Sequence, residues 1–303
     1  MMPGRSRPLV LMYHAVVPRD LRAEPAADRF LTGAGAIYQD DFENQLIALR
    51  RRFDLLHPEE YADQLARGRL PPTRSAVVTV DDGFQNLLDY ALPVAESLGI
   101  PLLAFISSGH LDGGPWLWFT RTATVRLTGG ADVSALHAGL KRLSLSSIEA
   151  ALETAGIPVD RRDDRLCRLL FEGARSADLE SACRRGRLVL GGHTVRHPNL
   201  SCETAEICAS EMIENREHLE KIAGTRIRMF AYPSGDFSPD TARIAMESGF
   251  DAAFAVNPPR EPLADELRRY HVPRVGINGP GRLRFWLKCS GVDYWRWRLG
   301  LLG

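Results

Sequence analysis

The sequence predicts an α/β protein built around a parallel sheet, and three observations support this prediction. Short runs rich in β-forming residues alternate along the chain with segments of helical periodicity. Several of these runs end in polar residues, at the end of a parallel strand where α/β proteins place their chemistry. The run at residues 76–80 is apolar or β-branched throughout, which is typical of a strand buried on both faces. A (β/α) barrel and a doubly wound open sheet share this pattern, so more specific motifs must decide between them.

The predicted elements alternate in a regular order. Strands are predicted at residues 9–13, 76–80, 102–106, 188–190, 229–232, 252–256 and near Val272. Helices are predicted at residues 41–51, 87–95, 204–222 and 239–248. From about residue 110 to residue 187, glycine-rich breaks separate short helical stretches. Because an ordinary βα connection has only about 2–6 residues, this segment is predicted to be a helical insertion.

Composition restricts the class of protein. The chain has 303 residues, of which 45% are hydrophobic and 25% charged, and we expect one globular domain over residues 1–303. Thirty-eight basic residues balance 38 acidic residues, so no overall field attracts nucleic acid. The five cysteines form no C-x-x-C pair, which argues against a disulfide framework and against a cysteine zinc site. Neither a signal peptide nor a membrane-spanning run is evident, and we expect a cytoplasmic protein.

Two adjacent carboxylates, Asp81 and Asp82, follow the most hydrophobic predicted strand. An Asp-Gly pair is common in solvated turns, but an apolar strand that leads into two carboxylates is less easily explained as a turn. Burying two like charges is costly unless a cation or a proton lies between them. A glycosidase pair is excluded, because such carboxylates flank a sugar at about 5–9 Å, which adjacent residues of one strand cannot do. We therefore predict a functional site at Asp81 and Asp82.

A pair of histidines, His193 and His197, follows the predicted strand at residues 188–190. Their separation of four residues predicts that both imidazoles lie on one side of a helical turn. Neutral imidazole and carboxylate are preferred zinc ligands, so one aspartate and two histidines supply three protein ligands. Such a set leaves a position for water, as catalytic zinc sites do. Two unrelated surface or capping histidines are the alternative interpretation.

Four segments together resemble a known family. V-T-V-D-D-G-F at residues 78–84 is similar to the T-F-D-D-G-[FY] motif of the polysaccharide deacetylases, also called the NodB-homology group or carbohydrate esterase family 4. H-T-V-R-H at residues 193–197 matches the H-[ST]-x-x-H motif, and F-A-Y-P-S-G at residues 230–235 is similar to one form of the third motif. L-M-Y-H-A-V at residues 11–16 resembles the start of the branch with an N-terminal Y-H motif. The four segments occur in the expected order, and together they are highly specific.

The resemblance implies an irregular (β/α) barrel with seven strands. It also implies a metal-dependent hydrolase that removes an N-acyl group, foremost acetyl, from an amino sugar of a glycan or glycolipid. By position, Asp82, His193 and His197 would hold a divalent metal, with Zn²⁺ expected and Co²⁺ as an alternative. Asp81 would be the general base that takes a proton from metal-bound water. The backbone N–H in the third motif, which corresponds to Ser234, would stabilise the oxyanion.

The leaving amine needs an acid, and the resemblance assigns this role to His14, the histidine of the Y-H motif. A buried histidine that caps the first strand is the alternative interpretation. His271 is a competing acid, because it lies where other members carry a late catalytic histidine. We rank His271 second, since it lacks their L-x-H-D context.

The third motif departs from the common family pattern R-x-P-Y. Ala231 stands where an arginine thought to orient the base aspartate is expected, and Ser234 replaces the tyrosine. We predict that another arginine, Arg274, takes over the orienting role. If none does, the chain is a metal-containing glycan-binding protein with impaired turnover. A deformylase of a lipid-linked amino sugar is a further alternative, because a formyl group needs the same chemistry.

Two aromatic segments have more than one interpretation. In the predicted insertion, G-G-P-W-L-W-F at residues 113–119 could stack on sugar rings, but we favour packing onto the barrel. The C-terminal tail, about residues 281–303, interleaves aromatic residues, among them Phe285 and Trp286, with five cations and one aspartate. This pattern suits an anionic membrane interface or a terminal helix packed on the barrel. The predicted partners are an N-acylated sugar or glycan, no nucleic acid and, on the first interpretation, a membrane surface.

Overall fold

Parallel strands form the centre of the protein, in a computed structural model that describes residues 8–24, 36–69, 71–72, 74–128, 132–256, 263–277, 279 and 281–290. The main sheet contains β1 (Leu9–Tyr13), β5 (Ser75–Asp82), β6 (Leu102–Ile106), β7 (Leu188–Gly192), β8 (Met229–Ala231), β9 (Ala252–Ala255), β10 (Val272–Pro273) and β11 (Val275–Gly276). Their order is β10-β9-β8-β7-β6-β5-β1-β11, and each neighbouring pair is parallel. The short β4 (Asp54–Leu55) pairs with the beginning of β5, and β2 (Val16–Val17) pairs with β3 (Ile37–Tyr38). Each strand predicted from the sequence is therefore present.

The sheet closes into a barrel because its two end strands belong to one short segment. β10 pairs with β9, β11 pairs with β1, and only Arg274 separates β10 from β11. Arg274 continues the ladder, since its N–H donates to the carbonyl oxygen of Ala255 at 2.9 Å. With residues 272–276 counted as one strand, the described part of the chain forms a ring of seven parallel strands. The predicted irregular (β/α)₇ barrel is confirmed, and the open sheet is excluded.

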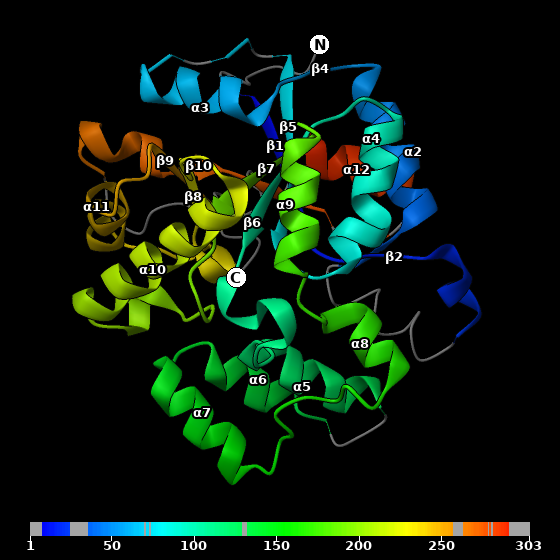
Figure 1. The fold of residues 1–303 in the computed structure, drawn as a ribbon, viewed down its shortest axis with the longest axis vertical. Helices are drawn as coiled ribbons and strands as arrows, with labels where there is room; N and C mark the ends of the chain where they lie inside the picture. The colour runs from blue at the N-terminus through cyan, green and yellow to red at the C-terminus, as the bar shows by residue number, and fades with distance from the viewer. Residues whose placement is uncertain are drawn as a thin grey trace.

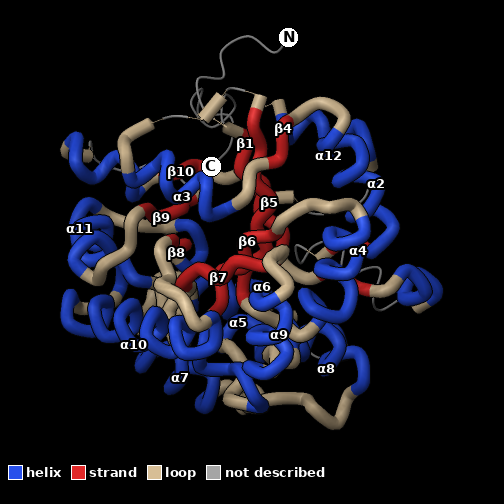
Figure 2. The backbone as a smooth tube through the Cα atoms, turned by 45° about the horizontal axis from the view of Figure 1, so that its top comes forward, coloured by secondary structure: helices blue, strands red, loops and turns tan. Residues whose placement is uncertain are grey.

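The strands are buried on both faces, which explains their nearly continuous apolar sequences. One set of strand residues fills the barrel interior: Val10, Val77, Leu103, Phe105, Met229, Ala231, Ala252, Phe254 and Val272. The alternate residues face the surrounding helices, as the period of two along a strand requires. These helices are α2 (Gln39–Arg50), α4 (Leu92–Ser97), α9 (Ser176–Arg184), α10 (Ala205–Ala223), α11 (Pro239–Glu247) and α12 (Arg282–Cys289) (Figure 2).

The two ends of the barrel are covered differently. At the end where the strands begin, α3 (Pro58–Ala66) packs Tyr61 and Leu65 against the barrel interior. At the opposite end lie the added helices α5 (Trp118–Leu127), α6 (Ser134–Leu140), α7 (Leu145–Thr154) and α8 (Arg165–Phe171), which Figure 1 shows as a group below the barrel. α9 falls in the range predicted as an insertion, yet it packs on the barrel through Leu179 and Ala182. The added helices therefore border the end of the barrel where the strands finish.

α12 contains the described part of the predicted C-terminal tail. Phe285 and Cys289 are buried, whereas Leu283 and Leu287 are 76% and 50% exposed. One face of the helix thus packs on the protein, and membrane contact through the tail stays a prediction. Residues 291–303, with the other tryptophans and arginines of the tail, lie outside the described residues. No helix in the described ranges combines the length and the apolar character that crossing a membrane requires.

Candidate active site

Asp81 and Asp82 end β5, and both side chains are buried. Asp82 has a φ of 75°, a left-handed conformation that aspartate tolerates better than most residues. Its carbonyl oxygen accepts hydrogen bonds from the N–H of Ser107 and from Nε2 of His110, each at 3.0 Å. The next residue, Gly83, has a φ of 90°, and a Cβ there would come within 2.7 Å of the Ile106 side chain. This turn brings two consecutive carboxylates to the same end of the barrel.

The loop at residues 193–197 follows β7, and it is not a helical turn. Thr194 and His197 have φ values of 66° and 58°, so the predicted helical arrangement of the two histidines is wrong. The loop instead folds back on itself, because the N–H of His197 donates to Oγ1 of Thr194 at 3.0 Å. Left-handed residues therefore bring His193 and His197 together.

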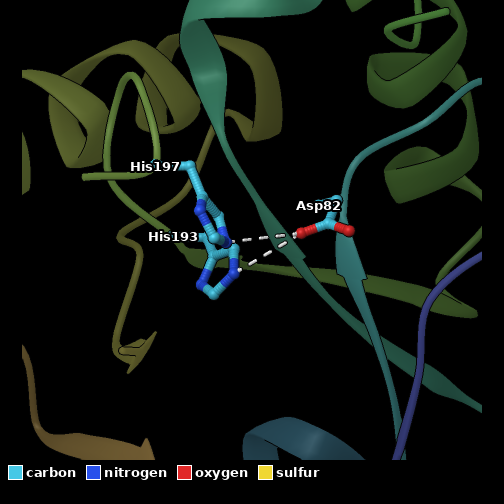
Figure 3. A group of neighbouring side chains, drawn as sticks. All are labelled: Asp82, His193 and His197. Atoms are coloured by element: carbon cyan, nitrogen blue, oxygen red, sulfur yellow. Dashed lines mark ion pairs between the residues drawn. The ribbon is translucent and has the colours of Figure 1, made fainter. Parts of the chain in front are cut away.

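Asp82, His193 and His197 form one compact, buried group (Figure 3). Oδ1 of Asp82 lies 3.7 Å from Nε2 of His193 and 3.7 Å from Nε2 of His197. One donor atom from each residue lies within 4.8 Å of the other two. Nδ1 of His193 donates to the carbonyl oxygen of Ala231 at 2.7 Å, which leaves Nε2 with its lone pair available. Two nitrogens and one oxygen thus converge as ligands of a metal ion would.

Burial determines the charges of this group. It raises the pKa of Asp82 to about 6 and lowers the pKa of His193 to about 4. Burial also lowers the pKa of His197 well below its usual value, and the neighbouring His193 adds to this effect. Neutral imidazoles with a carboxylate are a donor set for zinc and similar cations, and a cation would offset the cost of the buried carboxylate. These residues therefore fit a divalent metal ion.

Asp81 lies beside this group and forms a buried ion pair with Arg274. Nη1 of Arg274 donates to Oδ1 of Asp81 at 2.6 Å and to Oγ1 of Thr79 at 3.3 Å. The side chains of the pair are at most 3% exposed. Burial alone would raise the pKa of Asp81, but the charge and hydrogen bond of Arg274, with help from His193 and His14, hold this pKa below its usual value. Asp81 is therefore a carboxylate at neutral pH, held in place by an arginine.

A cleft of about 380 Å³ opens over these groups. All the site residues predicted from the sequence line it: His14, Asp81, Asp82, His193, His197, Ser234 and Arg274. His14 follows β1, and Ser234 follows β8 in a left-handed conformation with a φ of 58°. His271, the competing acid, lines a different hollow with Tyr61 of α3 and stacks on Phe237 at 5.1 Å between ring centres. The cleft thus brings His14, and not His271, to the predicted site.

Two polar residues of α10 hold the loop at residues 193–197, and no family motif marks them. Asn215 accepts a hydrogen bond from the N–H of His193 at 3.0 Å and donates to the carbonyl oxygen of Thr194 at 2.7 Å. Glu211 accepts from the next two N–H groups of the loop, at 2.8 and 2.9 Å. Both residues are buried on the inner face of α10, one turn apart. Polar residues four apart on an otherwise apolar helix face are the signal that could have found them.

The insertion supplies the opposite wall of the cleft. Nε1 of Trp118 donates to the carbonyl oxygen of His197 at 2.9 Å, and the ring centre of Phe119 lies 4.7 Å from that of His197. Trp118 is only 2% exposed, so these aromatic residues pack the insertion onto the barrel and also line the cleft. The same lining includes three basic residues, Arg126, His137 and Lys141.

Comparisons with known proteins agree with this fold. The family model described as polysaccharide deacetylase matches residues 69–253. Among solved structures, IcaB from Ammonifex degensii is similar with a TM-score of 0.61 and 20% identity, over 93% of this chain and 95% of that chain. Streptococcus pyogenes deacetylase PplD, solved in complex with acetate, is similar with a TM-score of 0.58 and 17% identity, over 91% of this chain and 94% of that chain. A de-N-acetylase from Aggregatibacter actinomycetemcomitans is similar with a TM-score of 0.56 and 15% identity, over 89% and 94% of the two chains.

The likeness to these structures shows the fold, and the family model shows the family. No curated protein matches the chain. The family model spans the segments at residues 78–84, 193–197 and 230–235, whereas the segment at residues 11–16 lies outside it. The assignment to the branch with the Y-H motif therefore stays a prediction. Because the model covers more than half of the chain and includes three of the segments from which the resemblance was read, that resemblance is confirmed, and the chain belongs to the polysaccharide deacetylase family.

Proposed function

We propose that this protein is a metal-dependent hydrolase that removes an N-acyl group, foremost acetyl, from an amino sugar of a glycan or glycolipid. Membership of the polysaccharide deacetylase family supports a carbohydrate deacetylase with an acetylated glycan as substrate. One observation carries the proposal: Asp82, His193 and His197 meet in a buried group beside the Asp81–Arg274 pair, and all five residues line one cleft.

The group formed by Asp82, His193 and His197 is the proposed metal site. A divalent cation bound there would supply a Lewis acid that polarises the acyl carbonyl and lowers the pKa of water. Zn²⁺ is the expected ion, because two imidazoles and one carboxylate are a known catalytic zinc set, and Co²⁺ is the alternative. The hydrogen bond from His193 to Ala231 supports this assignment, since it fixes which ring nitrogen keeps its lone pair.

Asp81 is the proposed general base. It lines the cleft as a carboxylate, and it would take a proton from the attacking water while the new C–O bond forms. Arg274 would orient Asp81 in place of the arginine that the third motif lacks at Ala231. Because a carboxylate with a lowered pKa stays ionised in neutral solution, Asp81 would be ready to accept a proton.

His14 and Ser234 are proposed for the second half of the reaction. His14 lines the cleft close enough for its charge to lower the pKa of Asp81. It would donate a proton to the amine nitrogen while the C–N bond breaks, so that the products are a carboxylic acid and a free amino sugar. The backbone N–H of Ser234, also in the cleft lining, would stabilise the negatively charged oxygen that forms in between.

The two alternatives differ from this proposal in turnover and in the acyl group. A glycan-binding protein without turnover was suggested by the missing arginine at position 231, and the hydrogen bond from Arg274 to Asp81 supports an enzyme instead. A deformylase of a lipid-linked amino sugar would use the same residues and would release formate rather than acetate.

Acid release from N-acylated sugars tests the proposal. Chelated protein should be inactive and should regain activity with Zn²⁺ or Co²⁺. The variant Asp81→Asn should keep its bound metal while turnover falls about 10²- to 10⁴-fold, because a general base contributes about that factor. Asp89→Asn removes an exposed carboxylate that does not line the cleft, and it should keep full activity.

The identity of the released acid separates the alternatives. Acetate supports the deacetylase and formate the deformylase. Release of neither acid by metal-loaded protein, from neutral oligosaccharides, sugar phosphates or lipid-linked amino sugars, would support the glycan-binding alternative.

A further inference from the structure

Two cations without an acidic partner lie on the insertion wall of the cleft. Arg126 and Lys141 are exposed and line the cleft, and within the described ranges no acidic side chain lies at ion-pair distance from either. Asp132, an exposed acid that precedes α6, instead accepts a hydrogen bond from the N–H of Ser134 at 2.9 Å. The two cations are therefore available to a bound anion.

The acids that line the cleft do not neutralise these cations. In the part of the chain that the structure describes, the acidic lining residues are Asp81 and Asp82. Asp81 is paired with Arg274, and Asp82 faces the two imidazoles of the proposed metal site. Both carboxylates are thus engaged on the barrel wall, and the charge on the insertion wall stays positive.

The chain segments that carry the two cations are attached to the loop of the proposed metal ligands. The carbonyl oxygen of Lys141 accepts a hydrogen bond from Nδ2 of Asn199, which follows His197 by two residues. On α5, Trp118 donates to the carbonyl oxygen of His197 at 2.9 Å. Oγ1 of Thr122 and Nδ1 of His137 lie 2.8 Å apart and join α5 to α6. α5, which carries Arg126, and α6, which is followed directly by Lys141, are therefore attached to the loop that carries His197.

One face of α5 runs from the metal site to the cations. Phe119, Ala123 and Arg126 follow helical spacing, and all three line the cleft. The ring of Phe119 contacts His197, and Arg126 lies seven residues further, about 10 Å along the helix axis. Burial lowers the pKa of His137 to about 4, and the charges of Lys141 and Arg126 add to this effect. Both cations therefore lie near His137, in the same part of the cleft lining.

We propose that the substrate of this protein is anionic, and that Arg126 and Lys141 bind its phosphate or carboxylate while its acyl group lies at Asp82, His193 and His197. This inference rests on the proposed function, because it names the class of substrate for the same cleft. Phosphate and carboxylate share the chemistry that arginine and lysine recognise. Their two sources are a glycosyl phosphate and an acidic sugar. A neutral oligosaccharide, in contrast, would cover two cations without pairing them, which is costly.

Ligand binding to metal-loaded Asp81→Asn protein tests the inference without requiring turnover. The probes are N-acetylglucosamine, N-acetylglucosamine 1-phosphate and N-acetylmuramic acid, which carry no charge, a phosphate and a carboxylate. Titration calorimetry should show that at least one charged probe binds about tenfold more tightly than the neutral probe. This advantage should shrink in about 0.5 M salt, because the cations are solvent-exposed.

Two variants locate the anion site. Arg126→Ala combined with Lys141→Ala should remove the advantage of the charged probe and leave the affinity for the neutral probe unchanged. The control Arg142→Ala removes an exposed cation next to Lys141 that does not line the cleft, and it should change no affinity. If the tighter binding of N-acetylglucosamine 1-phosphate depends on the two cations, the substrate is assigned as a glycosyl phosphate. If the tighter binding of N-acetylmuramic acid depends on them, the substrate is assigned as an acidic sugar.

Three results would overturn the inference. The first is equal affinity for all three probes. The second is a charged probe that still binds the double variant more tightly than the neutral probe does, since that probe would then bind the metal instead of the two cations. The third is an equal loss of affinity in Arg142→Ala, which would show an unspecific surface effect. Failure of the proposed function is a separate result: absence of acid release from wild-type protein would leave these binding differences unchanged.

Discussion

The two walls of the cleft differ in how their side chains are held. On the barrel wall, Asp81 and Asp82 are buried, and each has an arginine or histidine neighbour within 4 Å. On the insertion wall, Arg126 and Lys141 are exposed and, in the described ranges, face no acidic side chain at ion-pair distance. Chemistry needs groups with fixed geometry and defined charge, whereas recognition needs donors that remain free for a ligand. The difference suggests that the barrel supplies catalysis and that the insertion selects the substrate.

The largest effect is expected from Arg274→Ala on the barrel wall. Removing one partner of a buried ion pair costs about 3–5 kcal/mol of stability, because the remaining charge stays buried. Turnover should also fall at least about 100-fold, since the proposed base loses its orientation. Denaturant unfolding and acetate-release kinetics measure the two effects.

Two further variants accompany Arg274→Ala. Arg274→Lys keeps the positive charge and should recover part of the stability. Arg268→Ala, which removes an exposed arginine paired with the exposed Asp265, should change the free energy of unfolding by at most about 0.5 kcal/mol. Undiminished turnover in Arg274→Ala would show that Asp81 needs no arginine.

A smaller effect is expected from acid on metal-free protein. In the folded protein the pKa values of His110 and His193 are lowered to about 4 by burial, whereas unfolded histidine titrates near about 6.5. Between these values the unfolded state binds more protons, so the free energy of unfolding falls as the pH falls from about 6.5 to about 4. Asp82, with its pKa raised to about 6, acts in the opposite direction, but the lowered pKa values of His137 and His197 add two more histidines to the destabilising side.

Urea unfolding in neutral and in mildly acidic buffer measures this effect. Zn²⁺ should raise stability most at neutral pH, where its ligands are deprotonated. If the metal-free protein is equally stable in both buffers, the description of His110, His193 and His197 as buried, neutral imidazoles is contradicted.

The smallest effect is expected where the two walls meet, at Trp118. Trp118→Phe removes the hydrogen bond to the carbonyl oxygen of His197, which is worth about 1 kcal/mol, or about fivefold in metal affinity. Trp116→Phe is the matched control, because Nε1 of Trp116 is buried and, among the described residues, has no hydrogen-bond partner to lose. Calorimetric titration of the chelated proteins with Zn²⁺ compares them. Equal metal affinity in the two variants would mean that the insertion does not support the metal site.

The sequence predicted the barrel wall better than the insertion wall, for a physical reason. The proposed ligands Asp82 and His193 lie at or directly after the ends of strands whose apolar sequences place them at one end of a parallel barrel, so local patterns suffice. The departure at Ala231 also led to Arg274, and Arg274 lies against Asp81 in the folded chain.

Features that depend on contacts between distant segments were missed. The left-handed conformations of Thr194 and His197 are supported by Asn215 and Trp118, and neither residue lies within a motif. The sequence predicted short helical stretches within residues 110–187, but only packing of the insertion decides that Arg126 faces the cleft. Glu211 and Asn215 were also missed, although their spacing on an apolar helix face was a readable signal.

The seam at residues 272–276 links the proposed catalysis to closure of the barrel. This segment is the last strand of the ring in chain order, and it also delivers Arg274 to Asp81. If this segment were displaced, Asp82 and both histidines would keep their own strands, but the ring would be open and Asp81 would lose its arginine. The proposed hydrolysis would therefore require a closed barrel, and activity would report that closure.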